Sequence, residues 1–391
     1  MSLLTYLECV DCHDTFDPSS KQTYCTKCKA TLLVNYDLQA AHYKLDRDAF
    51  LQKPNGMWRW NELLPIHESA AITSLGEGDT PLLHLGRLGD LLNLTSLYVK
   101  DESINPTGSF KARGMSAAVS KAKELGIKKV VIPTAGNAGG ALAAYAARAG
   151  IEALIYMPND TPSANIVECR ISGATVVCVT GLISDAAIFA QKKAIEDGYF
   201  DMSTFKEPYR TEGKKIMGYE LAEAFKWVLP DVIIYPAGGG TGLIGLWKAF
   251  NELSELGWLE SAAMPRMIAV QSEGCAPIVK AMEMNLPYCE FWEQANTIAS
   301  GLRVPKSFAD KLILQYLRES EGTAIAVSDS DIVSAQRQLA STEGIFASPE
   351  GAATLAGLIK LVRMRKVAKH EKIVLFNTAT GLKYTVIEGN L

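Results

Sequence analysis

The sequence lacks blocks of like charge and long apolar runs. Lys and Arg number 39 against 43 Asp and Glu, so the net charge is only −4 at pH 7. That balance argues against nucleic acid or an anionic membrane surface as a partner. The longest uncharged run, residues 130–147, is interrupted by Pro133 and by glycines, and it is too short to span a bilayer. The first ten residues lack the basic start and apolar stretch of a signal peptide, so we expect a cytoplasmic protein.

Low-complexity segments and repeats of fixed period are also absent. Apolar residues make up 48% of the chain and charged residues 21%, which is typical of a globular protein. With 391 residues, the chain is long enough for two lobes that each have a core of their own.

The eight cysteines fall into two sets. Four are scattered over the later chain, which is typical of reduced, packed thiols. The other four form two Cys-x-x-Cys knuckles separated by twelve residues, Cys9 with Cys12 and Cys25 with Cys28. Two such knuckles can complete a tetrahedral zinc shell, and with four protein ligands the metal would be structural. The alternative is four incidental thiols.

Beyond residue 95, short apolar strands alternate with helical segments of about 10–15 residues. This pattern predicts an α/β fold in which parallel-rich sheets are covered on both faces by helices. The predicted strands are 97–100, 129–133, 153–157, 175–180, 232–235, 267–271 and 373–376, and the predicted helices are 109–125, 139–149, 163–172, 184–197 and 243–256.

Three glycine-containing loops follow predicted strands, and in open α/β sheets ligands bind at that edge. In the first loop, residues 105–114, Pro106 and Gly108 predict a turn, Ser109 can cap the next helix, and Lys111 falls in its first turn. A helix N-terminus disfavours a cation, which helps to depress the pKa of a lysine toward the neutral amine that attacks an aldehyde. An ordinary phosphate-binding or surface lysine is the alternative.

The second loop, residues 133–140, runs from a strand into an alanine-rich helix. Its backbone N–H groups, around Thr134 and Gly136, would suit a substrate carboxylate. Asn137 would project an amide beside a cofactor. A glycine-rich packing turn is the alternative.

The third loop, residues 236–242, contains Gly238, Gly239, Gly240 and Thr241 and would surround a phosphate with backbone N–H groups. The same loop begins a G-x-G-x-x-G motif at Gly240, and this motif is typical of a dinucleotide-binding site. Such a site needs an acidic residue about 20 residues further on, at the end of the next strand, and the nearest candidate there, Glu273, lies 28 residues past Gly245. The lysine loop would have no role there either, so we favour the phosphate.

A fourth segment, residues 376–383, follows the last predicted strand, and Thr378 is placed to offer a hydroxyl to a ring nitrogen. A plain turn is the alternative.

Together the loops resemble the fold-type-II pyridoxal phosphate (PLP) enzymes, and among them most closely the threonine synthases. The resemblance covers nearly the whole chain. The segments that carry it are, in order, the two cysteine pairs, Tyr36-Asp37-Leu38, Gly76–Leu82, Lys100-Asp-Glu102, Asn105–Lys111, Gly136-Asn137, Tyr209–Lys215, Gly238–Gly242 and Thr378–Lys383.

The resemblance implies that Lys111 holds PLP as a Schiff base and that Asn137 hydrogen-bonds the 3′-oxygen of the cofactor. Residues 238–241 would hold its phosphate, and Thr378 would face the pyridine nitrogen. Arg210 is the candidate for a substrate phosphate, because a guanidinium binds that group bidentately. A solvated arginine is the alternative for Arg210.

The resemblance further implies a two-lobed protein with a zinc-ribbon-like module. We expect the module over residues 1–40, a large PLP-binding lobe over 41–95 and 205–391, and a small lobe over 96–204. The implied activity is a lyase of threonine biosynthesis that converts O-phospho-L-homoserine and water into L-threonine and phosphate. A small-molecule amino-acid substrate and a homodimer are expected.

Three departures from many threonine synthases favour an alternative. Ala112 stands where they have Asp, and Ala138 where they often have a hydroxyl residue. The loop at residues 238–241 is similar to that of the dehydratases. A serine/threonine ammonia-lyase is therefore the second hypothesis, and a non-catalytic binding protein on the same fold is the third.

Overall fold

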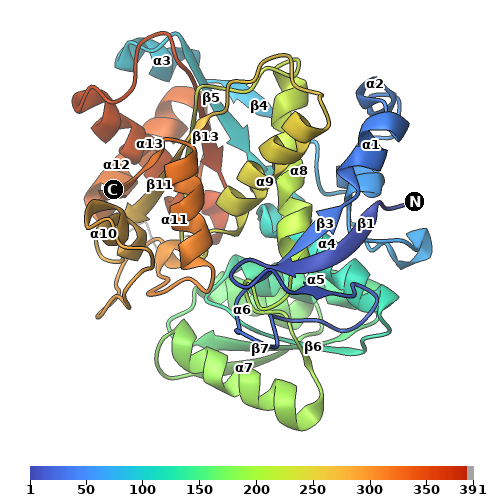
Figure 1. Cartoon of the computed structure of the whole chain (residues 1–391). Coiled ribbons are helices and arrows are strands. Elements are labelled where there is room, and N and C mark those ends of the chain that lie inside the picture. Colours follow the sequence, from blue (N-terminus) through green and yellow to red (C-terminus); the bar gives the residue numbers. More distant parts are fainter. Residues whose placement is uncertain (385–391) are drawn as a thin grey trace. The chain divides into compact units, whose positions relative to one another are not determined.

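The computed structural model describes residues 1–384 (Figure 1). The chain divides into two compact units. The first unit comprises residues 1–79, 105–219 and 248–258. The second comprises residues 80–104, 220–247 and 259 onward. Each unit has a sheet and a hydrophobic core of its own.

The first unit opens with a small antiparallel sheet in the order β2-β1-β3. Its strands are β1 (Leu4–Cys9), β2 (Thr15–Phe16) and β3 (Leu32–Tyr36). Leu7, Leu32 and Val34 are fully buried and pack in one core with the helices of the same unit. The cysteine module is therefore built into this unit.

The main sheet of the first unit is parallel, with the order β8-β7-β6-β9. Helix α5 packs on β7, and α7 packs on β6 and β7. The elements are α4 (Lys111–Glu124), β6 (Lys129–Pro133), α5 (Asn137–Ala149), β7 (Glu152–Pro158), α6 (Ser163–Ile171), β8 (Thr175–Val179), α7 (Ile183–Asp197) and β9 (Phe200–Asp201), with the short helices α1 (Leu38–Lys44) and α2 (Arg47–Phe50) after the small sheet. Helix α8 (Tyr209–Ala224) begins in this unit.

The second unit is built on a six-stranded sheet in the order β12-β11-β10-β13-β5-β4. All its strand pairs are parallel except β4 with β5. The central strand β10 is apolar and buried at every residue, as expected of a strand covered on both faces. The strands are β4 (Leu82–His84), β5 (Ser96–Asp101), β10 (Val232–Pro236), β11 (Arg266–Ser272), β12 (Thr323–Val327) and β13 (Lys372–Asn377).

Helices flank this sheet, and α13 packs against β10 to β13. Side-chain caps define where several of them begin: Ser328 accepts a hydrogen bond from the N–H of Asp331, and Ser348 from that of Gly351. The helices are α3 (Gly86–Leu92), the start of α9 (Thr241–Glu255), α10 (Pro277–Glu283), α11 (Asp310–Glu319), α12 (Asp329–Glu343) and α13 (Pro349–Arg363). Single 3₁₀ turns or short 3₁₀ helices lie at Met57–Leu63, Ser69–Ala71, Glu102–Ile104, Pro106–Gly108, Ser300–Leu302 and Gly381–Lys383.

The predicted α/β class with parallel-rich sheets and flanking helices is confirmed. The two units have other bounds than the expected lobes, because residues 41–79 and 205–219 group with most of the expected small lobe. The lobe bounds stay a prediction, and residues 385–391 of the expected large lobe lie outside the described residues. Within residues 1–384, we find no helix with the length and apolar character needed to cross a membrane.

Candidate active site

The four cysteines of the N-terminal module converge as the spacing predicts. Their sulfur atoms lie within 4.8 Å of one another, with Cys9 Sγ 3.3 Å from Cys28 Sγ and Cys12 Sγ 3.6 Å from Cys25 Sγ. In a tetrahedral zinc–thiolate site, sulfurs about 2.3 Å from the metal stand about 3.8 Å apart. Cys9 ends β1, and a tight turn after each knuckle brings the N–H of His13 to Cys9 O and that of Lys29 to Cys25 O. The donor set and its spacing fit a structural zinc ion, which stays a prediction.

We expect the purified protein to bind about one zinc ion per chain, measured by elemental analysis. Replacing Cys9 and Cys12 by serine together should remove the metal, because half of the thiolate ligands are lost. Cys178→Ser changes an exposed thiol outside the cluster and serves as the control that keeps the metal. Zinc still bound by the double variant, or no zinc taken up by the reduced natural protein, would contradict the prediction.

The lysine loop of the first unit positions Lys111 as the first residue of α4. The turn predicted at residues 106–108 is present: the N–H of Gly108 donates to Asn105 O at 2.8 Å, and Thr107 has a φ of 60°. The amine of Lys111 lies over the ring of Phe110, 3.9 Å from its centroid. The predicted place of Lys111 in the first helical turn is therefore confirmed.

The prediction that Ser109 caps the helix after the lysine loop is wrong. Phe110 occupies the N-cap position of α4, and its side chain makes no capping hydrogen bond. The 3₁₀ turn ends just before Ser109, so the extended backbone of that residue delays the helix by one position. As a result, the buried hydroxyls of Ser109 and Thr107 make no hydrogen bond to any residue between 1 and 384. Two orphaned polar groups thus lie in the same loop as Lys111.

The second glycine loop lies in the same unit, after β6. Helix α5 starts at Asn137 and packs against both the lysine-loop turn and α4. Thr134 is buried, and its hydroxyl accepts a hydrogen bond from the N–H of Gly136 at 3.2 Å. The structure therefore brings Thr134, Gly136 and Asn137 to the start of the helix that packs beside Lys111, while their roles stay predictions.

The third glycine loop lies in the second unit, between β10 and α9. A Cβ on Gly238 would come within 2.1 Å of Gly301 O, and one on Gly240, with a φ of +81°, within 2.2 Å of Ile313 Cδ1. Only glycine fits at these two positions. The hydroxyl of Ser307 donates to Gly239 O at 2.9 Å and fixes the loop. The loop leads directly into α9, which begins at Thr241. The N–H groups of the loop therefore precede the N-terminus of this helix.

Thr378 lies at the same edge of the six-stranded sheet. Strand β13 runs parallel to its neighbour β10, so the segments after Asn377 and after Pro236 emerge together. Thr378 is buried. The N–H of Ser348 holds this segment by donating to Ala379 O at 2.9 Å.

Arg210, the candidate for a substrate phosphate, lies in the first turn of α8. The alternative of a solvated arginine is wrong, because the residue is only 2% exposed. Its guanidinium donates to Met202 O at 2.8 Å and lies 3.8 Å from a carboxylate oxygen of Glu207. Burial lowers the pKa of Arg210. The phosphate-binding role stays a prediction.

The sequence reasoning missed two buried groups in this unit. Glu77 accepts hydrogen bonds from Trp58 Nε1, Ser116 Oγ, Tyr145 OH and the N–H of Leu75. Glu77 lies in the segment Gly76–Leu82 that carries part of the family resemblance, but no local pattern predicts that its carboxylate is a hydrogen-bond centre in the core.

The second missed group is Lys214, which faces the lysine loop. The polar stretch at residues 209–215 was not recognised as helical. A helical reading would have placed Arg210 and Lys214, four residues apart, on one face.

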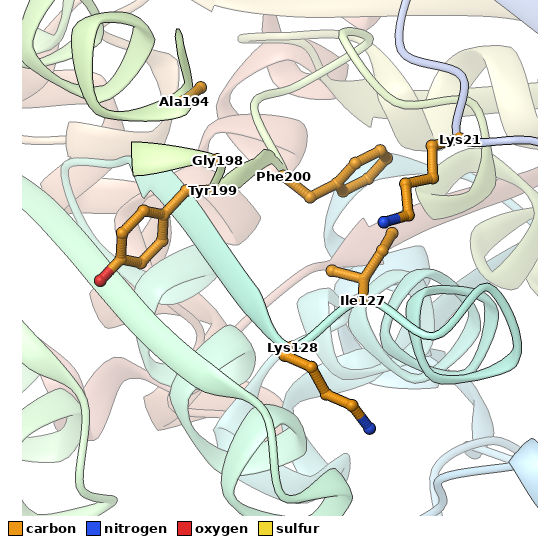
Figure 2. A pocket seen from close by; sticks show the side chains of 7 residues that line it. All are labelled: Lys21, Ile127, Lys128, Ala194, Gly198, Tyr199 and Phe200. Carbon is orange, nitrogen blue, oxygen red and sulfur yellow. The ribbon is translucent and has the colours of Figure 1, made fainter. Parts of the chain in front are cut away.

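A pocket also opens on the first unit (Figure 2). Figure 2 shows the side chains of Lys21 and Lys128 at this pocket, together with Tyr199 and Phe200. None of the predicted site residues lines it.

Comparison with known proteins assigns the family. The model of the family described as "Pyridoxal-phosphate dependent enzyme" matches residues 73–379. The chain is 34% identical over 386 residues to the threonine synthase of Methanosarcina acetivorans, covering 98% of this chain and 94% of that protein. It is 34% identical over 376 residues to the threonine synthase of Methanocaldococcus jannaschii, covering 96% and 92%.

Solved structures agree with the fold. Maize serine racemase superposes with a TM-score of 0.67 at 22% identity, over 77% of this chain and 88% of that one. The processed form of threonine deaminase isoform 2 from Solanum lycopersicum superposes with a TM-score of 0.65 at 23% identity, over 77% and 79%. The predicted resemblance is confirmed by the family model and the curated relatives: this chain belongs to the pyridoxal-phosphate-dependent enzymes and, within them, to the threonine synthases.

Proposed function

We propose that this chain converts O-phospho-L-homoserine and water into L-threonine and phosphate. One observation carries the proposal: the likeness to threonine synthases of two organisms extends over at least 96% of this chain, which includes the cysteine module. PLP is the cofactor of the family.

The second unit fits the phosphate and ring of this cofactor. The N–H groups of Gly238, Gly239 and Gly240 make no backbone hydrogen bond within residues 1–384, and they precede the N-terminus of α9. Such N–H groups and the helix dipole favour a bound phosphate. The buried hydroxyl of Thr378, at the same sheet edge, is suited to face a ring nitrogen.

The first unit fits the aldehyde side of the cofactor and the substrate. Lys111 supplies the amine, and the orphaned hydroxyls of Thr107 and Ser109 supply hydrogen-bonding groups in the same loop. Asn137 would hold the 3′-oxygen of the cofactor. The start of α5, with Thr134 and Gly136, would bind the substrate carboxylate at its N–H groups.

In the mechanism, bound PLP delocalises the negative charge that develops when the Cα proton leaves. Lys111 would hold the cofactor covalently between turnovers. Once released by the substrate amine, the Nζ atom of Lys111 would take the proton from Cα and return it there at the end. Arg210 would bind the substrate phosphate. That phosphate leaves from Cγ as a proton leaves Cβ, Cγ then takes up a proton, and water adds its hydroxyl at Cβ. Reactive species of this kind require exclusion of bulk water while Lys111 is free.

The second candidate is a serine/threonine ammonia-lyase, favoured by the run of glycines at residues 238–240 and by Ala112 and Ala138, which place no polar side chain at those positions. The test incubates the pure PLP-loaded protein with phosphohomoserine, and separately with L-serine and L-threonine. We expect phosphate and threonine from the first and negligible 2-oxo acid from the others. Formation of 2-oxobutyrate from threonine without phosphate release from phosphohomoserine would establish the lyase instead. No turnover together with no PLP absorption band would support a non-catalytic binding protein.

A cytoplasmic location and a homodimer belong to the same proposal. The small amino-acid substrate and the absence of a membrane-crossing helix among residues 1–384 support the location, and the homodimer stays a prediction. Size-exclusion chromatography with light scattering would measure the oligomeric state.

A further inference from the structure

A buried carboxylate lies against Arg210 at the start of α8. Glu207 is only 1% exposed, and its carboxylate accepts the N–H groups of Tyr209 at 2.8 Å and of Arg210 at 3.1 Å. The Nε atom of Arg210 lies 3.8 Å from the same carboxylate. The first N–H groups of a helix and a guanidinium both favour a negative charge. Glu207 therefore supplies the anion at a place that suits one.

The contact with Glu207 leaves the guanidinium of Arg210 incompletely bonded. Its Nη1 atom donates to Met202 O at 2.8 Å and to Thr204 Oγ1 at 3.3 Å. Its Nε atom is buried and makes no hydrogen bond to any residue between 1 and 384, since 3.8 Å is too long for one. A buried donor without an acceptor is costly. Arg210 is therefore suited to receive an oxygen atom from a ligand.

The charge on Glu207 is held only weakly. Burial raises the pKa of this carboxyl to about 7, although Arg210 acts in the opposite direction. The other charged groups around the pair come from α8, α4, β9 and the segment after β9, and they are Lys214, Lys111, Asp201 and Lys206. A second anion close to Glu207 would raise its pKa further, because like charges favour the neutral carboxyl. Glu207 can therefore give up its charge when an anion arrives.

We propose that Glu207 and the substrate phosphate exchange the negative charge beside Arg210: the carboxylate faces Arg210 in the free enzyme and takes up one proton from solvent when the phosphate binds there. This inference rests on the proposed role of Arg210 in binding the phosphate. The exchange balances, because one O–H bond forms on Glu207 and Arg210 faces one anionic group before and after binding.

The exchange makes Glu207 a specificity-determining residue. A phosphate is doubly charged and binds a guanidinium bidentately, so it can replace a carboxylate that lies 3.8 Å from Arg210 Nε. Serine and threonine carry no anionic group on their side chains and leave the contact between Glu207 and Arg210 intact. Glu207 thereby favours a substrate that carries a phosphate.

The experiment measures binding of radiolabelled sulfate to the PLP-loaded protein by equilibrium dialysis between pH 6 and pH 9. Sulfate is the probe because it keeps two negative charges throughout this range, so a change of affinity with pH does not come from the probe. Glu207→Gln is the main variant, since an amide has nearly the same shape and stays neutral. Glu196→Gln, which changes an exposed carboxylate on α7, is the matched control.

We expect the natural protein and Glu196→Gln to bind sulfate about tenfold more weakly at pH 8 than at pH 6, because Glu207 has lost at pH 8 the proton that binding requires. Glu207→Gln should bind with an affinity that changes little with pH, and about tenfold more tightly than the natural protein at pH 8. Calorimetry of the natural protein in two buffers of different ionisation enthalpy should show uptake of about one proton per sulfate at pH 8. That measurement needs no variant.

Three results would overturn the inference. The first is an equal affinity of the natural protein at pH 6 and pH 8. The second is a pH dependence that Glu207→Gln retains, because another group, such as Lys214, would then be the one that titrates. The third is weaker binding by Glu207→Gln at every pH, since that pattern describes a structural role.

Arg210→Met separates this inference from the proposed function. If that variant binds sulfate as the natural protein does, the role of Arg210 is wrong, and this inference with it. If Arg210→Met loses sulfate while Glu207→Gln keeps the natural pH profile, only the role of Glu207 is wrong.

Discussion

Replacing Lys111 by alanine is expected to abolish the PLP adduct band and to lower turnover of phosphohomoserine at least about 1,000-fold. Loss of a positioned base alone typically costs about 10²–10⁴-fold in rate, and this variant also loses the covalent anchor of the cofactor. The measurements are the visible absorption spectrum of the PLP-loaded protein and the rate of phosphate release.

Lys123→Ala is the control for this prediction, because Lys123 is an exposed lysine on the same helix, α4. It should keep both the band and the rate. The far-ultraviolet circular dichroism of both variants should match that of the natural protein. A band that survives in Lys111→Ala and disappears only when another lysine is also removed would assign the anchor elsewhere.

Replacing Lys215 by methionine should cost about 3–5 kcal/mol of unfolding free energy. Lys215 is completely buried, and its amine lies 2.8 Å from Glu212 and 2.9 Å from Glu252. Lys248 pairs with Glu212 at 2.5 Å, so the four side chains balance in charge. Without Lys215, one carboxylate stays buried without a counter-charge. Urea unfolding followed by tryptophan fluorescence measures the loss.

This network also joins the cysteine module to the helices of the first unit. Tyr36, the last residue of β3, donates its hydroxyl to Glu212 at 2.8 Å, and Lys248 donates to Val34 O at 2.5 Å. We therefore expect Lys215→Met to loosen the module, seen as faster amide exchange in β3. Lys192→Met, which removes an exposed ion pair on α7, should change stability little.

The sign of the pH dependence follows from Glu212. Burial alone would raise the pKa of this carboxyl, but Lys215 and Lys248 outweigh burial and hold the pKa below its ordinary value. A folded-state pKa below the unfolded one contributes stability at neutral pH that is lost as the pH falls through the folded value.

Adding Glu252→Gln to Lys215→Met should recover part of the unfolding free energy that Lys215→Met loses, because it removes the unpaired charge. An unfolding free energy of Lys215→Met within about 1 kcal/mol of the natural protein would contradict the network's role.

The sequence by itself determined the fold class and the positions of the main loops. Strands such as β6 and β10 are apolar runs bounded by proline and glycine, and their signal is local. The first-turn position of Lys111 and the cysteine spacing are local signals as well. For the same reason the glycine loop at residues 238–242 was recognisable, since the close approaches that exclude a Cβ leave glycines in the sequence.

Only the tertiary structure decided which charged side chains are buried and what they meet. Lys214 is 103 residues from Lys111 in sequence, and Tyr36 is 176 residues from Glu212. The run at residues 209–215 is polar, and nothing in its composition shows that Arg210, Lys214 and Lys215 are all buried. Burial of a charge depends on partners that packing supplies from distant segments, and no local pattern encodes those partners.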